Sequence, residues 1–290
     1  MRMPTRPDHR DVVRPRTTPE AIRQLIARLT PRDLRIMSLV WEHRVFTTDQ
    51  IARLEFGSYH TAKKRLPILY RLRALDRFRP WTPVGTAPWH YILDTPGAEI
   101  LAAEHGQTAR ELGYRRDRVL TIAYRSSLSH TLGVNEFFVD LQAHTRTHDT
   151  HLVWRTAREC ERQFGDIIRP DAAGRWTAGN RSIDFFLEYD TGTEPLRRLA
   201  GKLDAYHELN RITGNRGVVL FYLPSAKREE HLRHRVPNAP VATATAVHGA
   251  HPAERVWTLL NASAPRRLVD LRTRGLVQPS IPGWEDIDGG

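Results

Sequence analysis

The ten residues at positions 181–190, RSIDFFLEYD, constrain the fold more than any other segment of the chain. Their polar and apolar side chains alternate, and successive side chains of a β-strand point to opposite faces of a sheet. One face would carry Ile183, Phe185, Leu187 and Tyr189. The other would carry Phe186 and the carboxylates of Asp184, Glu188 and Asp190. Buried carboxylates are unfavourable unless a metal ion, basic side chains or solvent compensates them, so this strand predicts a sheet with a charged feature on one face.

The segments around this strand predict a mixed α/β domain. Thr193 is a candidate N-cap for a helix whose apolar stripe runs through Leu196, Leu199, Leu203 and Tyr206. The run GVVLFYL at 217–223 is typical of a buried strand. The other elements we expect are a helix at 131–145, strands at 152–160 and 167–171, a helix at 226–235, and edge strands at 241–247 and 254–259. The predicted core order is therefore α-β-β-β-α-β.

Residues 30–73 predict three short helices. Thr30 followed by proline is a helix start, and Thr47 with Gln50 fits a capping box. Ser58 can cap a third helix that begins at Tyr59, with a kink or break expected at Pro67. The third helix combines an apolar stripe with many basic residues, which is typical of the recognition helix of a helix-turn-helix protein.

A β-hairpin is predicted directly after these helices. Two aromatic-rich runs, 78–81 and 89–93, are joined by a Gly/Pro turn. A hairpin in this position corresponds to the wing of a winged helix-turn-helix, and a short helix at 96–104 closes the unit. The DNA-contact candidates are Tyr59, His60, Thr61, Lys63, Lys64, Arg65 and Arg71 on the third helix and Arg77 and Arg79 beside the hairpin. The alternative is a small helical unit that contacts other proteins.

The net charge of +11 is concentrated in the first part of the chain. Residues 1–120 hold 22 Lys and Arg against 13 Asp and Glu, a difference of +9, whereas residues 121–290 hold 22 against 20, a difference of +2. A polyanion such as DNA or RNA is the natural partner of such a region, since each neutralised phosphate releases counterions. The alternative is the arginine-rich composition of a high-GC genome.

Composition also narrows the expected location. No apolar stretch reaches the roughly 18 residues that a membrane span needs, so we expect no membrane partner. The single cysteine, Cys160, cannot form an internal disulfide, which fits a reducing cytoplasm.

Three segments resemble the replication-relaxation family, whose members occur in actinobacteria and in plasmids and integrative elements. They are TPRDLRIMSLVWEHRVFTTDQIARLEF at 30–56, WHYILDTPGAEIL at 89–101 and LEYDTGTEPLRRLAGKLDAYHEL at 187–209. The similarity covers about residues 28–258. It implies a role in plasmid or mobile-element replication, relaxation or transfer. The implied partners are double-stranded DNA and replication or transfer proteins.

The second half is also similar to the PD-(D/E)xK nuclease fold, also called restriction-endonuclease-like. Pro170-Asp171 matches the first motif and Glu188 the second acid, while Asp190 occupies the usual lysine position. The resemblance implies a catalytic set of Asp171, Glu188 and Lys202, with Lys202 supplied from the following helix. It also implies a Mg²⁺ ion held by Asp171, Glu188, Asp190 and Glu136, and hence a metal-dependent DNA endonuclease.

The displaced lysine leaves a second interpretation open. In it the chain is a non-catalytic transcriptional regulator or replication-initiation adaptor, and a degenerate nuclease-like domain forms a homodimer or docks a partner. In both interpretations we expect an α+β or α/β protein. Its parts would be a disordered basic arm at 1–28, a winged helix-turn-helix at 29–106, an αβββαβ nuclease-like domain at 118–260 and an irregular tail at 261–290.

Overall fold

The computed structural model describes residues 17–82, 84–124 and 127–271, so most of the expected arm and part of the expected tail lie outside the described residues. The chain divides into two compact units, unit 1 up to Asn135 and unit 2 from Glu136. This division falls later than the interval 106–118 expected from the sequence. The reason is apolar packing, because Ile122 and Leu128 join Val45 and Phe78 in one buried cluster of unit 1.

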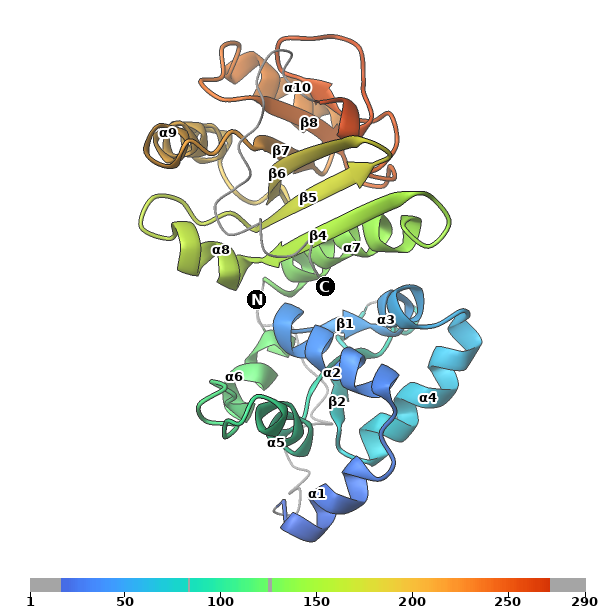
Figure 1. Cartoon of the computed structure of the whole chain (residues 1–290). Helices are drawn as coiled ribbons and strands as arrows, with labels where there is room; N and C mark the ends of the chain where they lie inside the picture. The colour runs from blue at the N-terminus through green and yellow to red at the C-terminus, as the bar shows by residue number, and fades with distance from the viewer. Residues whose placement is uncertain (1–16, 83, 125–126, 272–290) are drawn as a thin grey trace. The chain divides into compact units, whose positions relative to one another are not determined.

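Unit 1 is helical with one small sheet (Figure 1). The sheet has three antiparallel strands in the order β1-β3-β2. The elements of unit 1 are α1 (Pro19–Ile26), α2 (Pro31–His43), β1 (Phe46–Thr47), α3 (Thr48–Glu55), α4 (Tyr59–Arg71), β2 (Leu75–Phe78), β3 (His90–Leu93), α5 (Thr95–Glu104), α6 (Arg116–Leu120), the 3-10 helix η1 (Thr121–Tyr124) and the start of α7 (Leu128–His144).

Helix α1 corrects the expectation of a disordered arm for residues 19–26. The Thr18 side chain accepts a hydrogen bond from the Ala21 amide, and Pro19 occupies the first turn, where its missing N–H has no cost. Leu25 is buried. Capping by Thr18 and the burial of Leu25 thus account for the order of residues 19–26.

The helix starts predicted in 30–73 are confirmed. Thr30 forms a capping box with Asp33, and Thr47 forms one with Gln50. The Ser58 hydroxyl accepts a hydrogen bond from the Thr61 amide, and α4 begins at Tyr59. Helix α4 runs through Pro67 without interruption, so the expected break is absent. A hairpin is present as β2 and β3, which pair in antiparallel register from Leu75 opposite Leu93. Its second strand lies within the predicted run 89–93, but its first strand is Leu75–Phe78 and not 78–81, so residues 79–81 belong to the connecting loop.

Unit 2 is a six-stranded mixed sheet with helices on both faces (Figure 1). The strand order is β4-β5-β6-β7-β8-β9; β6, β7 and β8 are parallel, and the other neighbours are antiparallel. The elements that follow α7 are β4 (Thr150–Thr156), α8 (Ala157–Phe164), β5 (Ala172–Ala178), β6 (Arg181–Tyr189), α9 (Leu196–Thr213), β7 (Val218–Leu223), α10 (Ala226–Arg235), β8 (Thr243–Val247), β9 (Thr258–Leu259) and the 3-10 helix η2 (Leu268–Asp270).

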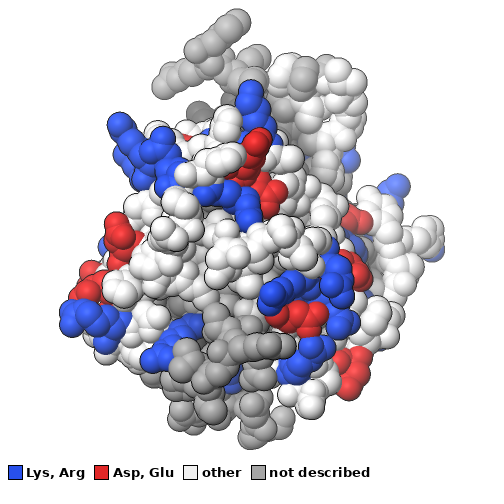
Figure 2. Space-filling view, turned by 90° about the horizontal axis from the view of Figure 1, so that it is seen from above, with Lys and Arg blue, Asp and Glu red and all other residues white. Residues whose placement is uncertain are grey.

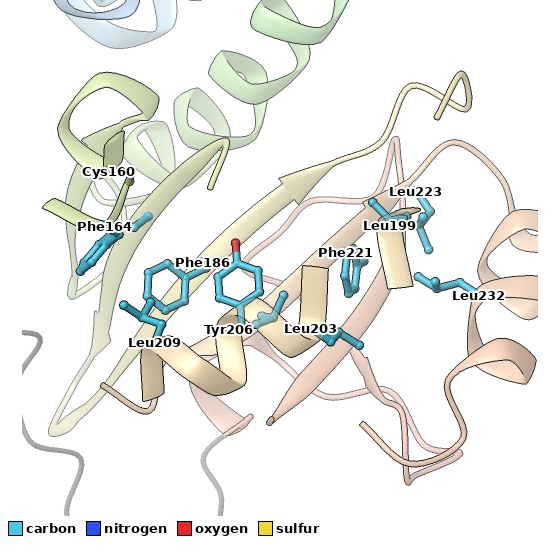
Figure 3. Close-up of a cluster of buried hydrophobic side chains, with 12 residues drawn as sticks. Cys160, Phe164, Phe186, Leu199, Leu203, Tyr206, Leu209, Phe221, Leu223 and Leu232 are labelled. Atoms are coloured by element: carbon cyan, nitrogen blue, oxygen red, sulfur yellow. The ribbon is translucent and has the colours of Figure 1, made fainter. Parts of the chain in front are cut away.

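Strand β6 alternates between two cores, as its sequence predicts. Phe185 packs against Phe137 and Phe138 of α7 on one face. Phe186 joins a second cluster on the other face, where Tyr206 and three leucines of α9 pack against α8, β7 and α10 (Figure 3). Glu188 is two residues after Phe186 in the strand, so its side chain points to the same face of the sheet, which is the face that α9 covers.

Three predictions for unit 2 are wrong in detail. The strand expected at 152–160 ends at Thr156, because Thr156 and Glu159 form a capping box that starts α8. Residues 167–171 are not a strand; Asp171 directly precedes β5 instead of ending a strand. Helix α9 begins after Pro195, which has no side-chain cap, and not at Thr193. From α7 to β7 the observed order is the expected one with α8 inserted.

Candidate nucleic-acid interface and buried carboxylate site

Helix α4 has a basic exposed face and an apolar buried face. Ala62, Leu66 and Leu69 are fully buried and fix the helix on unit 1. The exposed members of the predicted DNA-contact set on this helix are Tyr59, His60, Thr61, Lys63, Lys64 and Arg71. The helix contains no acidic residue. The sequence therefore folds into a surface that carries positive charge without internal compensation.

Arg65 does not belong to this exposed face. Its guanidinium forms an ion pair with the buried carboxylate of Asp33, and its Nη2 also donates to the Arg28 carbonyl at 3.0 Å. The bond from Arg65 Nε to Asp33 Oδ1 is 3.0 Å. Burial raises the pKa of Asp33, but the hydrogen bonds from Arg65 and Thr30 outweigh it and hold the pKa below its usual range. Arg65 thus links α4 to α2, which is a structural role.

Arg77 and Arg79 both lie over the indole ring of Trp89. The Arg77 guanidinium carbon is 3.9 Å from the Trp89 ring centroid, and that of Arg79 is 4.0 Å away. Arg77 also lies 4.3 Å from the ring of Tyr70 in α4. We refer to Tyr70, Arg77, Trp89 and Arg79 as the cation–π stack. Each such contact contributes of order 0.5–2 kcal/mol, so the stack fixes the hairpin to α4.

In unit 2, Glu188 is bonded to two side chains of α9. Lys202 Nζ lies 2.6 Å from one of its carboxylate oxygens, and the Tyr206 hydroxyl donates to the other at 2.5 Å. Lys202 Nζ is also 3.6 Å from a carboxylate oxygen of Glu194. The Glu188 side chain has 0% exposure. Lys202 and Tyr206 are four residues apart on one helix, so α9 presents both groups to the same carboxylate.

Asp171 lies beside this group. Ala172 pairs with Leu187 in the antiparallel register, which puts Asp171 next to Glu188 across the strands. The Tyr189 amide donates to the Asp171 carboxylate at 2.9 Å. The structure therefore brings Asp171, Glu188 and Lys202 to one place.

The local electrostatics are governed by burial. Loss of hydration, reinforced by the charge of Asp171, raises the pKa of Glu188 to about 7, even though Lys202 and Tyr206 both favour its ionised form. Burial alone would lower the pKa of Lys202, but Glu188 and Asp171 outweigh it and raise that pKa. Lys202 consequently remains an ammonium that faces two carboxyl groups.

Two further carboxylates, Asp184 in β6 and Asp190 directly after it, have arginine partners of their own. Asp184 accepts two hydrogen bonds from Arg175 on β5, at 2.7 and 3.0 Å. Asp190 pairs with Arg228 of α10 and also accepts a hydrogen bond from the Gly192 amide at 2.9 Å. Asp184 and Asp190 are both nearly fully buried. The structure thus neutralises these acids separately and does not bring Asp190 into a common ion site with Glu188.

Glu136 lies on the other side of the sheet. It belongs to α7, and its charge raises the pKa of Tyr189 and, more weakly, that of Tyr222, for both of which burial is the larger cause. These tyrosines share the face of Phe185, whereas Glu188 faces α9. The structure therefore does not bring Glu136 to the carboxylates of Asp171 and Glu188.

The resemblance to nucleases predicted a Mg²⁺ ion beside these carboxylates. That ion prefers oxygen ligands in near-octahedral geometry at about 2.0–2.1 Å. Both oxygens of Glu188 are already engaged by donors, and the nearest cation is the Lys202 ammonium. Within residues 17–82, 84–124 and 127–271, no three His, Cys, Asp or Glu side chains are grouped so that they could hold a metal ion.

Three partners in these sites were not anticipated from the sequence. Tyr206 was expected only in the apolar stripe of α9, although its spacing of four from Lys202 places both on one side of the helix. Arg175 is separated from Asp184 by a turn, and strand register decides their pairing. Arg228 is 38 residues from Asp190, and no local pattern links the two.

Charges of both signs are interspersed on the face drawn in Figure 2. Groups of blue basic side chains lie beside red acidic ones, and no broad area of a single sign is visible in this view. This face alone would not predict a polyanion partner. The acid-free surface of α4 is the stronger indication.

The comparisons with known proteins give one positive result. A family model described as replication-relaxation matches residues 37–219, which is more than half of the chain. No curated protein matches, and no solved structure matches. Across the described ranges, no helix combines the length and apolar character required to cross a bilayer. The matched region extends from α2 in unit 1 to β7 in unit 2, and the chain therefore belongs to the replication-relaxation family.

Proposed function

We propose that unit 1 is a winged helix-turn-helix that binds double-stranded DNA through α4, and that the chain acts in DNA replication or relaxation by this binding. The order α2-β1-α3-α4-β2-β3 and the three-stranded sheet support this assignment, since a recognition helix followed by a β-hairpin wing has this order. The family description, replication-relaxation, supports DNA as the partner.

The exposed basic face of α4 is the observation that carries the proposal. Lys63 and Lys64 are exposed on a helix that has no acidic residue, and within the described part of the chain neither forms an ion pair. An acidic neighbour three or four residues away would stabilise a lysine on a helix surface, and α4 provides none. Lysines without acidic partners, on a helix whose opposite face is buried in the fold, are suited to contact the phosphates of a duplex.

Anisotropy of a fluorescein-labelled duplex, titrated with the full-length protein, tests the proposal. Lys63→Ala/Lys64→Ala is expected to weaken binding about tenfold or more, since each residue contributes a phosphate or base contact. Lys227→Ala removes an exposed lysine from α10 in unit 2 and serves as the matched control, with no expected change. Equal binding by all three proteins would refute the assignment of α4.

For unit 2 we propose a nuclease-like core that does not cleave DNA. The helix and strand order supports the likeness, and the placement of Asp171, Glu188 and Lys202 supports it further. The engagement of both Glu188 oxygens by Lys202 and Tyr206 supports the absence of catalysis. The separate pairing of Asp190 with Arg228 does so as well.

A cleavage assay distinguishes this proposal from a metal-dependent endonuclease. Supercoiled, linear and single-stranded DNA are incubated with the protein and Mg²⁺ or Mn²⁺. We expect no cleavage above the level of an Asp171→Ala/Glu188→Ala variant. Cleavage by the wild-type protein that is lost in this variant would establish the enzymatic interpretation, with Asp171, Glu188 and Lys202 as its catalytic set.

A further inference from the structure

The hairpin of unit 1 exposes a tryptophan that the fold does not use. Trp81 lies in the loop between β2 and β3, and 48% of its surface is accessible. Tryptophan is among the largest apolar side chains, and most of its value to a fold comes from burial. Tryptophan is enriched at interfaces, because its ring is apolar while its N–H can still form a hydrogen bond.

The cation–π stack holds the base of this loop in place. Trp89, on the β3 side of the loop, is half-buried, and the guanidinium groups of Arg77 and Arg79 lie over its ring. Tyr70 extends the stack to α4. Hairpin and α4 are therefore coupled by four planar groups in succession, so a ligand that is gripped by α4 would meet the loop in a defined position.

The charge around Trp81 indicates what kind of ligand fits. Between Asp76 and Asp94 the chain has no acidic residue, whereas it has two arginines, Arg77 and Arg79, and two tryptophans, Trp81 and Trp89. An apolar protein partner would not need cations beside the indole. A nucleic acid with an unstacked base offers both an aromatic face for Trp81 and phosphates for the arginines.

We propose that Trp81 stacks on an unpaired base at the end of a duplex held by α4, so that DNA with a junction between double and single strands is preferred over blunt duplex. This inference rests on the proposed DNA binding by unit 1 and specifies the ligand of that same unit. Removal of a base–aromatic stack typically weakens binding by about 5- to 150-fold.

The test uses full-length protein and three labelled DNAs that share one duplex sequence: a blunt duplex, a forked duplex and the corresponding single strand. Wild-type protein is expected to bind the fork at least about fivefold more tightly than the blunt duplex. Trp81→Ala should abolish that preference and leave blunt-duplex affinity unchanged, whereas Trp81→Phe should restore most of it. Ile212→Ala in α9 removes another exposed apolar side chain, with 56% accessible, and should change nothing.

The outcomes separate this inference from the proposed function. Tight binding of blunt duplex without a fork preference, or equal losses on both DNAs in Trp81→Ala, would refute base stacking and leave duplex recognition intact. No binding to any of the DNAs would refute both. A change of oligomeric state in Trp81→Ala by size-exclusion chromatography, with unchanged fork affinity, would assign Trp81 to a contact between two copies of the chain.

Discussion

Glu188 and Lys202 form a buried ion pair whose two halves depend on each other. The pair has a 2.6 Å bond, and the carboxylate has no exposed surface. Removal of one member of a buried pair leaves the other charge without compensation, whereas removal of both charges is tolerated much better. The stability of unit 2 should therefore respond more to the balance of this pair than to either residue alone.

Lys202→Met is expected to lower the free energy of unfolding by about 3–5 kcal/mol, because it leaves Glu188 buried and unpaired. The double variant Lys202→Met/Glu188→Gln should recover at least half of that loss, since a neutral amide oxygen can still accept the Tyr206 hydroxyl. Urea denaturation of the two single variants and the double variant measures the coupling. Losses that simply add would show that the pair is not coupled.

The raised pKa of Glu188 predicts a pH dependence of stability. In the folded chain this pKa is about 7, against an ordinary value of 4.5. Because the folded value lies above the unfolded one, the proton stabilises the folded state fully below pH 4.5, and this contribution is lost as the pH rises toward 7. The shift corresponds to at most about 3 kcal/mol.

The Glu188→Gln variant cannot titrate at this position. Its comparison with the wild type therefore isolates the pH dependence of stability that comes from the Glu188 carboxyl group. Between pH 4.5 and 7 the free energy of unfolding of the wild type should fall relative to that of the variant. Parallel curves for the two proteins over this range would contradict the raised pKa. Both proteins keep all other titrating groups, so those contributions cancel.

Strand β5 and helix α9 each contain a glycine, and the two have opposite roles. A Cβ at Gly174 would lie 2.4 Å from the ring of Phe185, its partner across the sheet, and 3.1 Å from Phe138. A Cβ at Gly201 would meet no atom within 4 Å. Gly174 therefore makes room for the aromatic core between β5 and α7, whereas Gly201 has no packing function.

We expect Gly174→Ala to destabilise unit 2 by about 1–3 kcal/mol, because the rings of a packed core must shift to admit the methyl group. Gly201→Ala should stabilise it by about 0.5–1 kcal/mol, since alanine loses less backbone entropy in a helix interior. Thermal or urea unfolding of the two variants measures both effects. The same sign for both would be inconsistent with the packing around Gly174.

The sequence predicts the start of a helix well where that start depends on hydrogen bonds within a single turn. The starts of α2, α3 and α4 were predicted from Thr30, Thr47 and Ser58, whose side chains bond to amides only three residues away. The same signal was present at Thr156 and Glu159 and marks α8, but the apolar run before it favoured a longer strand. The alternation of β6 is also predictable, because the two-residue period of a strand is visible in its own sequence and does not depend on the neighbouring strands.

Long-range pairing was not predictable in the same way. Whether Asp190 meets a metal, Lys202 or Arg228 depends on how α10 returns to the sheet after β7, and nothing near Asp190 encodes this. The position of Glu136 depends on the face of the sheet that α7 covers. The closeness of Lys202 to Glu188 followed from helix geometry, whereas the closure of that site by Tyr206 required knowledge of how deeply α9 is buried.

Across the whole chain, the two units divide the charge unequally. Unit 1 includes α4 and the hairpin with uncompensated cations, whereas the acids of β6 and Asp190, which follows it, each have a basic partner in unit 2. We therefore propose DNA contact for unit 1. In unit 2 we propose that the carboxylates serve internal stability.

The salt dependence of duplex binding tests this division most directly. Contact with phosphates makes the logarithm of affinity fall linearly with the logarithm of salt concentration, with a slope of about −0.9 for each phosphate contact. We expect a linear fall for the wild-type protein and for Lys227→Ala, with the same slope. For Lys63→Ala/Lys64→Ala we expect a slope that is smaller in magnitude by about 2. A wild-type affinity that does not change with salt, or a double variant with the wild-type slope, would contradict the assignment of DNA binding to α4.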